Sequence, residues 1–221
     1  MNLPVVICTE GFCSQKGRII KELILASASP RRKELLQTIG LEFKVVTSDA
    51  DEGSVSSEGV PVGIYVQELA LIKAAAVAKS VLKNKKALII AADTVVTLDG
   101  KVLGKPKDAQ DAFNMLKSFS GREHEVYTGI CLMRVSDGKT YCTSQSTKVY
   151  FKDLTDEQIR AYIATGEPMD KAGAYGIQGK GTVLVSKIDG DYNNVVGLGT
   201  SLLCEALKKE FDFDILLGCR R

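Results

Sequence analysis

The stretch Leu23–Arg32, which reads LILASASPRR, decides the fold class of this chain. Its first four residues form a short apolar run, typical of a buried β-strand. The serine and proline that follow predict the opening of a helix: Ser29 as the capping residue and Pro30 in the first turn, where a proline loses no hydrogen bond. A strand that passes directly into a helix is the basic unit of an α/β fold.

The alternation of strand and helix signals continues after this stretch. Apolar residues at helical spacing lead to Gly40, which is expected to end the first helix, and residues 43–46 predict a second strand. An alanine-rich helix is expected over residues 62–82, followed at 87–91 by a strand buried on both faces. Asp-Gly pairs at 99–100, 137–138 and 189–190 indicate hairpins or tight turns, and further helices are expected at 108–119, 155–165 and 198–209.

This mixture of strand–helix units and hairpins predicts an α/β fold with a mixed, twisted sheet and flanking helices. We expect one domain over residues 23–221, long enough to bury a full core, with residues 1–22 as an N-terminal extension.

Composition argues against several classes of function. Lys and Arg number 29 against 27 Asp and Glu, so the net charge of +2 gives no electrostatic case for binding nucleic acid. The longest apolar stretch, residues 87–96, is too short to cross a bilayer. The N-terminus lacks the basic segment and apolar core of a secretory signal. We therefore expect a cytoplasmic protein with reduced cysteines and no contact with a membrane.

Two groups of residues are candidates for chemistry. The mouth of the first expected helix combines free backbone N–H groups with two hydroxyls and two guanidiniums, which suits a phosphate. The alternative is an ordinary capped helix with two solvated arginines. The residues concerned are Ser27, Ser29, Arg31 and Arg32.

The second candidate is Asp93, which has apolar residues on both sides. An unpaired buried carboxylate costs several kcal/mol, so Asp93 must lie at a strand end or be buried with a partner. Strand ends that face a cleft are common ligand sites in α/β sheets. A structural aspartate that caps a turn is the alternative.

Three further segments are weaker candidates. The acidic loop at 48–53 is either solvated or a source of a second metal-binding carboxylate, and Lys105 is either a surface lysine or a phosphate ligand. The glycine-rich stretch 167–179 lets the backbone approach a ligand closely. Its polar side chains are Asp170, Lys171, Tyr175 and Gln178. The single histidine, His124, has no GxSxG motif to work with, which argues against a serine hydrolase.

Five motifs in order, SASPRR, AADTVV, LGKPKD, SGREHEVYTG and EPMDKAGAYGIQG, resemble the Maf family of nucleotide pyrophosphatases. The resemblance covers the chain from about residue 23 to near 211. It implies an elongated fold with a cleft between two lobes, a homodimer and a requirement for a divalent cation. The chain departs from the family in residues 1–22 and at Gly199, where many members have proline.

The resemblance also implies roles for individual residues. Asp93 is the implied proton acceptor, with Lys73 and Lys105 as further catalytic groups, and Glu52 joins Asp93 as a metal ligand. The implied substrate-binding residues are Ser27, Arg31, Thr94 and Gln178. Arg31, Thr94 and Gln178 match the subgroup that acts on dTTP and UTP.

The predicted function is therefore hydrolysis of nucleoside triphosphates, preferentially dTTP and UTP, to the monophosphate and pyrophosphate with Mg²⁺ or Mn²⁺. Two alternatives stay open. One is a nucleotide-sensing module that regulates septum formation with little turnover, and the other is a general α/β phosphatase that releases orthophosphate.

Overall fold

The computed structural model describes residues 20–217, and within them one seven-stranded mixed sheet has the strand order β2-β1-β3-β5-β6-β7, with β4 paired to β3. Strand β1 is parallel to β2 and β3, and the remaining pairs are antiparallel. The mixed sheet predicted from the sequence is confirmed. The strands are β1 (Glu22–Leu25), β2 (Lys44–Val45), β3 (Ala87–Leu98), β4 (Lys101–Leu103), β5 (Glu123–Arg134), β6 (Thr140–Phe151) and β7 (Val185–Asp189).

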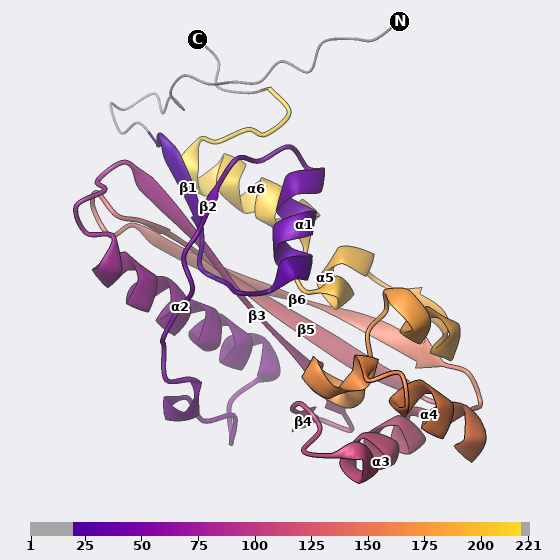
Figure 1. Cartoon of the computed structure of the whole chain (residues 1–221). Helices are drawn as coiled ribbons and strands as arrows, with labels where there is room; N and C mark the ends of the chain where they lie inside the picture. The colour runs from indigo at the N-terminus through magenta and orange to yellow at the C-terminus, as the bar shows by residue number, and fades with distance from the viewer. Residues whose placement is uncertain (1–19, 218–221) are drawn as a thin grey trace, which may run out of the picture.

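Helices flank both faces of this sheet (Figure 1). The long helix α2 packs on one face against β3 and β5, and α1 and α6 cover the other face. The helices are α1 (Pro30–Thr38), α2 (Val62–Ser80), α3 (Ala109–Phe119), α4 (Asp156–Ile163), α5 (Tyr192–Val196) and α6 (Thr200–Phe211). Short 3-10 turns are η1 (Glu52–Ser54), η2 (Glu167–Asp170), η3 (Ala172–Ala174) and η4 (Gly179–Leu184).

The unit formed by β1 and α1 follows its local sequence signals. The Ser29 side chain accepts a hydrogen bond from the Arg32 amide, and Pro30 occupies the first turn of the helix. Gly40 follows the helix with φ +78, a left-handed conformation that glycine adopts without strain. Capping and stop signals therefore set both ends of α1.

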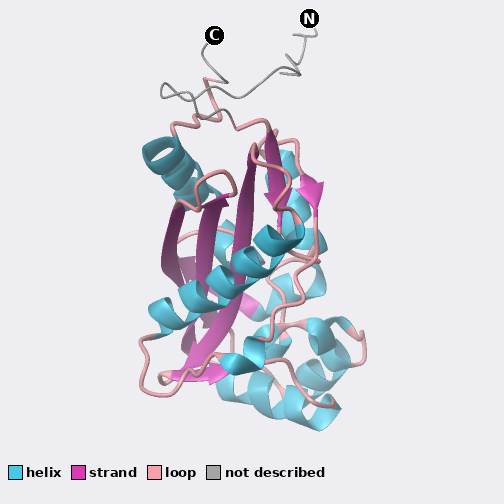
Figure 2. Cartoon of the chain, turned by 90° about the vertical axis from the view of Figure 1, so that its left-hand side faces the viewer, coloured by secondary structure: helices cyan, strands magenta, loops and turns pink. Residues whose placement is uncertain are grey.

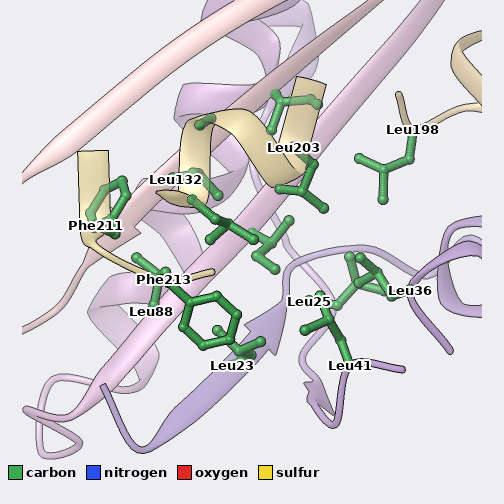
Figure 3. Close-up of a cluster of buried hydrophobic side chains, with 14 of the residues drawn as sticks. Leu23, Leu25, Leu36, Leu41, Leu88, Leu132, Leu198, Leu203, Phe211 and Phe213 are labelled. Carbon is green, nitrogen blue, oxygen red and sulfur yellow. The ribbon is translucent and has the colours of Figure 1, made fainter. Parts of the chain in front are cut away.

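Strand β3 is buried on both faces, as predicted, because its side chains alternate between two hydrophobic clusters. Leu88, Ile90 and Ala92 pack with α6 and α1 in the first cluster, shown in Figure 3 with Leu203 and Phe211. The intervening residues of β3 pack under α2, among alanines that let the helix lie close to the sheet. Position along β3 therefore decides which face of the sheet a side chain reaches.

A third cluster forms a second lobe around α3 and α4. It joins residues of both helices to the far ends of β5 and β6 and includes Phe119, Phe151 and Tyr175. Strands β3, β5 and β6 have twelve residues each and run from one lobe into the other (Figure 2). The elongated two-lobed form implied by the family resemblance is confirmed.

The structure differs from the sequence expectations at two places. Strand β3 continues to Leu98, seven residues beyond the expected end, because its antiparallel pairing with β5 extends from Leu88 to Thr97. The Asp189–Gly190 pair leads into α5 and not into a hairpin, since Asp191 caps that helix.

Most of the extension expected at residues 1–22 lies outside the described residues, and Glu22 is the first residue of β1. No helix within residues 20–217 is long and apolar enough to cross a membrane. Cys131, Cys142 and Cys204 are free thiols, and the other three cysteines lie outside the described part of the chain.

Candidate active site

A cavity of about 1060 Å³ lies between the two lobes. The N-terminal end of α1, one side of α2, the middle of β3, the segment after β4 and the glycine-rich loop contribute its lining. All eight site residues expected from the sequence line this one cavity, although they come from segments up to 151 positions apart. They are Ser27, Arg31, Glu52, Lys73, Asp93, Thr94, Lys105 and Gln178.

Asp93 lies in the middle of β3, where it is 7% exposed. Its Oδ1 is 2.5 Å from Lys73 Nζ, and the same ammonium is 3.0 Å from Glu52 Oε1. Three positions were open to Asp93: burial with a partner, a strand end and a turn cap. Burial with a partner is confirmed, and the other two are wrong. The strand does not end at Asp93, because the residue pairs in register with Gly129 of β5.

Gly129 explains how Lys73 comes so close to Asp93. A Cβ atom at this position would lie 2.3 Å from the Val66 carbonyl oxygen, so only glycine lets α2 approach β5 this closely. Lys73 lies two turns along α2 from Val66. The packing of the helix on the sheet therefore places the ammonium over the buried carboxylate.

The two neighbouring arginines at the start of α1 have different surroundings. Arg32 donates from Nε to the Gly197 carbonyl (2.8 Å), from one terminal nitrogen to Ser27 Oγ (3.2 Å) and from the other to Thr94 Oγ1 (3.0 Å). Burial lowers the pKa of the Arg32 guanidinium, and the nearby Asp93 carboxylate opposes that shift. Arg31 forms an ion pair with Asp170, with 3.6 Å between Arg31 Nη1 and Asp170 Oδ2.

Two solvated arginines at a capped helix are therefore the wrong interpretation for Arg32. Its guanidinium connects α1, β3 and the residue after α5, so it fixes three segments of the cavity relative to one another. In the sequence, Arg32 belongs to the expected phosphate-binding group, with no role separate from that of Arg31. The SPRR motif gives no local signal to distinguish it from Arg31.

The glycine-rich loop forms the opposite side of the cavity and carries Gln178. Lys105, in the segment after β4, lines the cavity beside this loop. The Gly173 amide donates to the Gly104 carbonyl (3.0 Å), so the loop is joined to the segment that carries Lys105. Gln178 is the residue immediately before η4. Glu167, the first residue of the EPMDKAGAYGIQG motif, also lines the cavity, although no role was expected for it from the sequence.

His124 lies behind this loop. It is 3% exposed, stacks on Phe119 with ring centroids 4.2 Å apart, and has Nε2 2.7 Å from the Tyr175 hydroxyl. Burial lowers its pKa to about 4, so the imidazole is neutral near pH 7. Tyr175, a predicted polar contact of the cavity, has its hydroxyl directed at His124. These two residues support the loop from the hydrophobic cluster of the second lobe.

The two carboxylates expected to hold a metal, Glu52 and Asp93, are joined by the Lys73 ammonium. No group of three or more potential ligand residues occurs in the part of the chain that the structure describes. Magnesium is often held by one or two carboxylates together with substrate phosphates. The donor set therefore fits a cation whose coordination is completed by a bound nucleotide, and it does not form a protein cage.

This chain is similar in sequence to known proteins over most of its length. A family model described as Maf-like protein matches residues 22–210. A dTTP/UTP pyrophosphatase of Thermoanaerobacter sp. (strain X514) is 51% identical over 195 residues, 88% of this chain and 100% of the relative. The dTTP/UTP pyrophosphatase of Bacillus cytotoxicus is 50% identical over 193 residues, 87% of this chain and 97% of the relative. The corresponding Caldanaerobacter subterraneus protein is 50% identical over 190 residues, 86% and 89%.

Proposed function

The chain belongs to the Maf family, and we infer from this membership and from its cavity that it hydrolyses nucleoside triphosphates, preferentially dTTP and UTP, to the monophosphate and pyrophosphate. The observation that carries this conclusion is the meeting of a buried carboxylate, Asp93, with Lys73, Arg31 and Lys105 in one cavity. A carboxylate can accept a proton from water, and the cationic groups can hold phosphates.

In the proposed reaction Asp93 is the general base. A water oxygen attacks the α-phosphorus and gives a proton to the Asp93 carboxylate, the bond between this phosphorus and the α,β-bridging oxygen breaks, and pyrophosphate leaves. Lys73 holds Asp93 in place through the 2.5 Å contact between its ammonium and Asp93 Oδ1. A bound Mg²⁺ or Mn²⁺, held by Glu52 and Asp93, would supply Lewis acidity toward the phosphate oxygens.

Phosphate binding is assigned to the cations around the mouth of α1. A triphosphate brings about four negative charges, which Arg31, Lys73, Lys105 and the metal ion would balance. Free N–H groups at the start of α1 add a favourable dipole for one phosphate, and Ser27 lies at the same end of the helix. We propose that these groups orient the triphosphate with its α-phosphorus toward Asp93.

Base selection is assigned to Gln178 and Arg31. Uracil and thymine present an N3–H donor between two carbonyl acceptors, which one glutamine amide can pair with on two sides. Arg31 is a pure donor and favours a carbonyl over the amino group of cytosine. We propose that these hydrogen bonds separate uracil and thymine from cytosine, and that purines are rejected by their size.

The test is the product of UTP hydrolysis. We expect pyrophosphate and UMP from the purified full-length chain with Mg²⁺ or Mn²⁺. Release of orthophosphate instead would assign the cavity to a phosphatase. Binding of UTP without any product would favour the nucleotide-sensing module, which the names of the relatives do not favour.

Three further properties are proposed from the family resemblance. The protein is a homodimer, acts in the cytoplasm, and has its catalytic domain at residues 23–221 behind an N-terminal extension. Light scattering on the full-length chain and on a chain that starts at Lys21 would test the oligomeric state. Equal turnover of UTP by the two chains would support the domain boundary.

A further inference from the structure

The turn that carries Gln178 is held from behind by the carboxylate of Glu167. Glu167 Oε2 accepts a hydrogen bond from the Lys180 amide (3.1 Å), and Oε1 accepts one from the Gly181 amide (3.1 Å). These amides begin the 3-10 turn η4, directly after Gln178. A carboxylate at the N-terminal end of a helical turn pairs with free N–H groups that would otherwise lack partners.

Tyr162 links the same carboxylate to the other side of Gln178. Its hydroxyl donates to Glu167 Oε1 (3.0 Å) and accepts from the Gly176 amide (3.2 Å). The phenol is 5% exposed, and burial raises its pKa, so it stays protonated and able to donate. The backbone is therefore held two residues before Gln178 and again at Lys180 and Gly181 after it.

Glycines allow the carboxylate to lie this close to the turn. A Cβ atom at Gly181 would meet the Gly176 carbonyl oxygen at 2.0 Å, so the two ends of the turn are in contact. A Cβ atom at Gly179, which has φ +64, would lie 3.1 Å from Glu167 Oε2. Of residues 176–181, Gln178 alone brings a polar side chain to the cavity lining.

Both carboxylate oxygens of Glu167 accept hydrogen bonds from protein groups. A carboxylate in a cavity for a triphosphate would repel the ligand unless its charge were compensated. Two backbone amides and one phenol provide that compensation, whereas the partner of Glu52 is the Lys73 side chain. This arrangement favours a structural link to Gln178 over a role in holding a metal.

We propose that Glu167 is a positioning residue for base selection, which fixes the backbone of Gln178 so that its amide can distinguish uracil from cytosine. The inference rests on the proposed function, because it assumes that Gln178 reads the base. Discrimination by hydrogen bonds needs donor and acceptor placed within about half an ångström. Loosening the turn should therefore cost selectivity before it costs the chemical step.

The test is Glu167→Gln in the full-length chain. Whichever oxygen is replaced by the amide nitrogen, at least one of the three donors around residue 167 then faces another donor. We expect the ratio of kcat/KM for UTP to that for CTP to fall about tenfold or more, the size expected for one unpaired buried group. KM for UTP should rise more than kcat falls. Tyr162→Phe keeps the bonds from the Lys180 and Gly181 amides to Glu167 and removes the acceptor of the Gly176 amide, so it should change the ratio in the same direction by less.

Asp214→Asn is the matched control. Asp214 Oδ1 accepts from two successive amides, Leu216 and Leu217, in a turn that does not line the cavity. It should leave the UTP to CTP ratio unchanged. If Glu167→Gln lowers kcat/KM for both nucleotides equally, or lowers kcat alone, Glu167 does not position Gln178 and the proposal is overturned.

A second measurement separates this inference from the proposed function. Amide hydrogen exchange of residues 176–181 in the nucleotide-free protein should be about tenfold or more faster in Glu167→Gln than in the wild type, since its protecting bonds are weakened. Unchanged exchange overturns the positioning role whatever the turnover. Wild-type protein that releases no pyrophosphate from UTP overturns the proposed function, while faster exchange still supports Glu167 as the residue that fixes the turn.

Discussion

The two sides of the cavity satisfy their polar groups in different ways. On the charged side, formed by Arg31, Glu52, Lys73 and Asp93, side chains pair with other side chains. On the loop side, residues 167–181, the Glu167 carboxylate pairs with backbone amides. Side-chain pairs can exchange their partners for a phosphate or a cation without moving the backbone. Bonds to the backbone instead fix a shape, so we assign phosphate binding and chemistry to the charged side, and to the loop side the positioning of Gln178, which reads the base together with Arg31.

The largest expected effect tests the charged side. Asp93→Asn should lower kcat for UTP by roughly 10²-fold or more, because an amide cannot accept the proton from water. The substitution hardly changes volume, so nucleotide should still bind. Steady-state kinetics and calorimetric titration with UTP measure the two quantities.

Asp99→Asn is a suitable control, because Asp99 lies in the β3–β4 turn and pairs with Arg122 away from the cavity. It should leave kcat unchanged. Near-normal turnover by Asp93→Asn would refute Asp93 as the base and would remove the main difference between the two sides.

The next effect concerns His124, which contacts Tyr175 of the loop side, and it is measured as a change in the free energy of unfolding with pH. The folded protein holds His124 neutral with a pKa of about 4, whereas an unfolded chain binds a proton below pH 6.5. The unfolded state therefore binds more protons between these values. The stabilising contribution of His124 is fully present above pH 6.5 and is lost as pH falls toward 4, by up to roughly 3 kcal/mol.

Urea unfolding at several pH values between 7 and 4 measures this loss. His124 is the single histidine of the chain, so His124→Gln should flatten the slope between pH 6.5 and 5, where few carboxylates titrate. An equal slope in the variant would mean that other groups cause it. Such a result would leave the His124–Tyr175 contact without a role in acid sensitivity.

Arg31→Ala is expected to act through the exposed part of the charged side. It should lower kcat/KM for UTP by about 1.5–3 kcal/mol, the range for a hydrogen bond to a charged group. Lys33→Ala, an exposed cation on the same helix, is the control and should change kcat/KM little. Equal effects of the two substitutions would mean that general surface charge, and not contact with the nucleotide, explains the role of Arg31.

Elements with local signals could be predicted from the sequence. Ser29, Pro30 and Gly40 set the limits of α1, and the capping box at Thr155 and Gln158 begins the helix expected after residue 155. These signals act within one turn of chain, so they need no knowledge of the rest of the fold. Six of the eight expected residues lie in the family motifs, and Glu52 and Lys73 were expected from weaker local similarity outside them.

Features that depend on long-range packing could not be predicted. Arg31 and Arg32 are neighbours in the sequence but point about 100° apart on a helix, and the docking of α1 on the sheet decides which one is buried. The position of Asp93 within β3 depends on β5, which lies 30 residues further along. The bond from Glu167 to Lys180 closes a loop that has no periodic pattern.

The smallest expected effect tests whether Thr94 belongs to the charged side. Thr128 gives its hydroxyl proton to the Asn194 carbonyl, so the single Thr94 hydroxyl proton faces two acceptors, Thr128 Oγ1 (2.9 Å) and the Gly197 carbonyl (3.3 Å). The Thr94 oxygen accepts from Arg32. These contacts leave the Thr94 oxygen engaged with protein groups. Its influence on the substrate should therefore pass through Arg32.

Thr94→Val keeps the shape of the side chain and removes the acceptor for Arg32. We expect kcat/KM to fall by about 1 kcal/mol, roughly fivefold, and to fall alike for UTP, dTTP and CTP. Thr97→Val, on the same strand but outside the cavity lining, should leave kcat/KM unchanged. A change in the UTP to CTP ratio as large as that expected for Glu167→Gln would show that Thr94 contacts the base itself. Base contacts would then extend to β3, because Thr94 would read the same group as the glycine-rich loop.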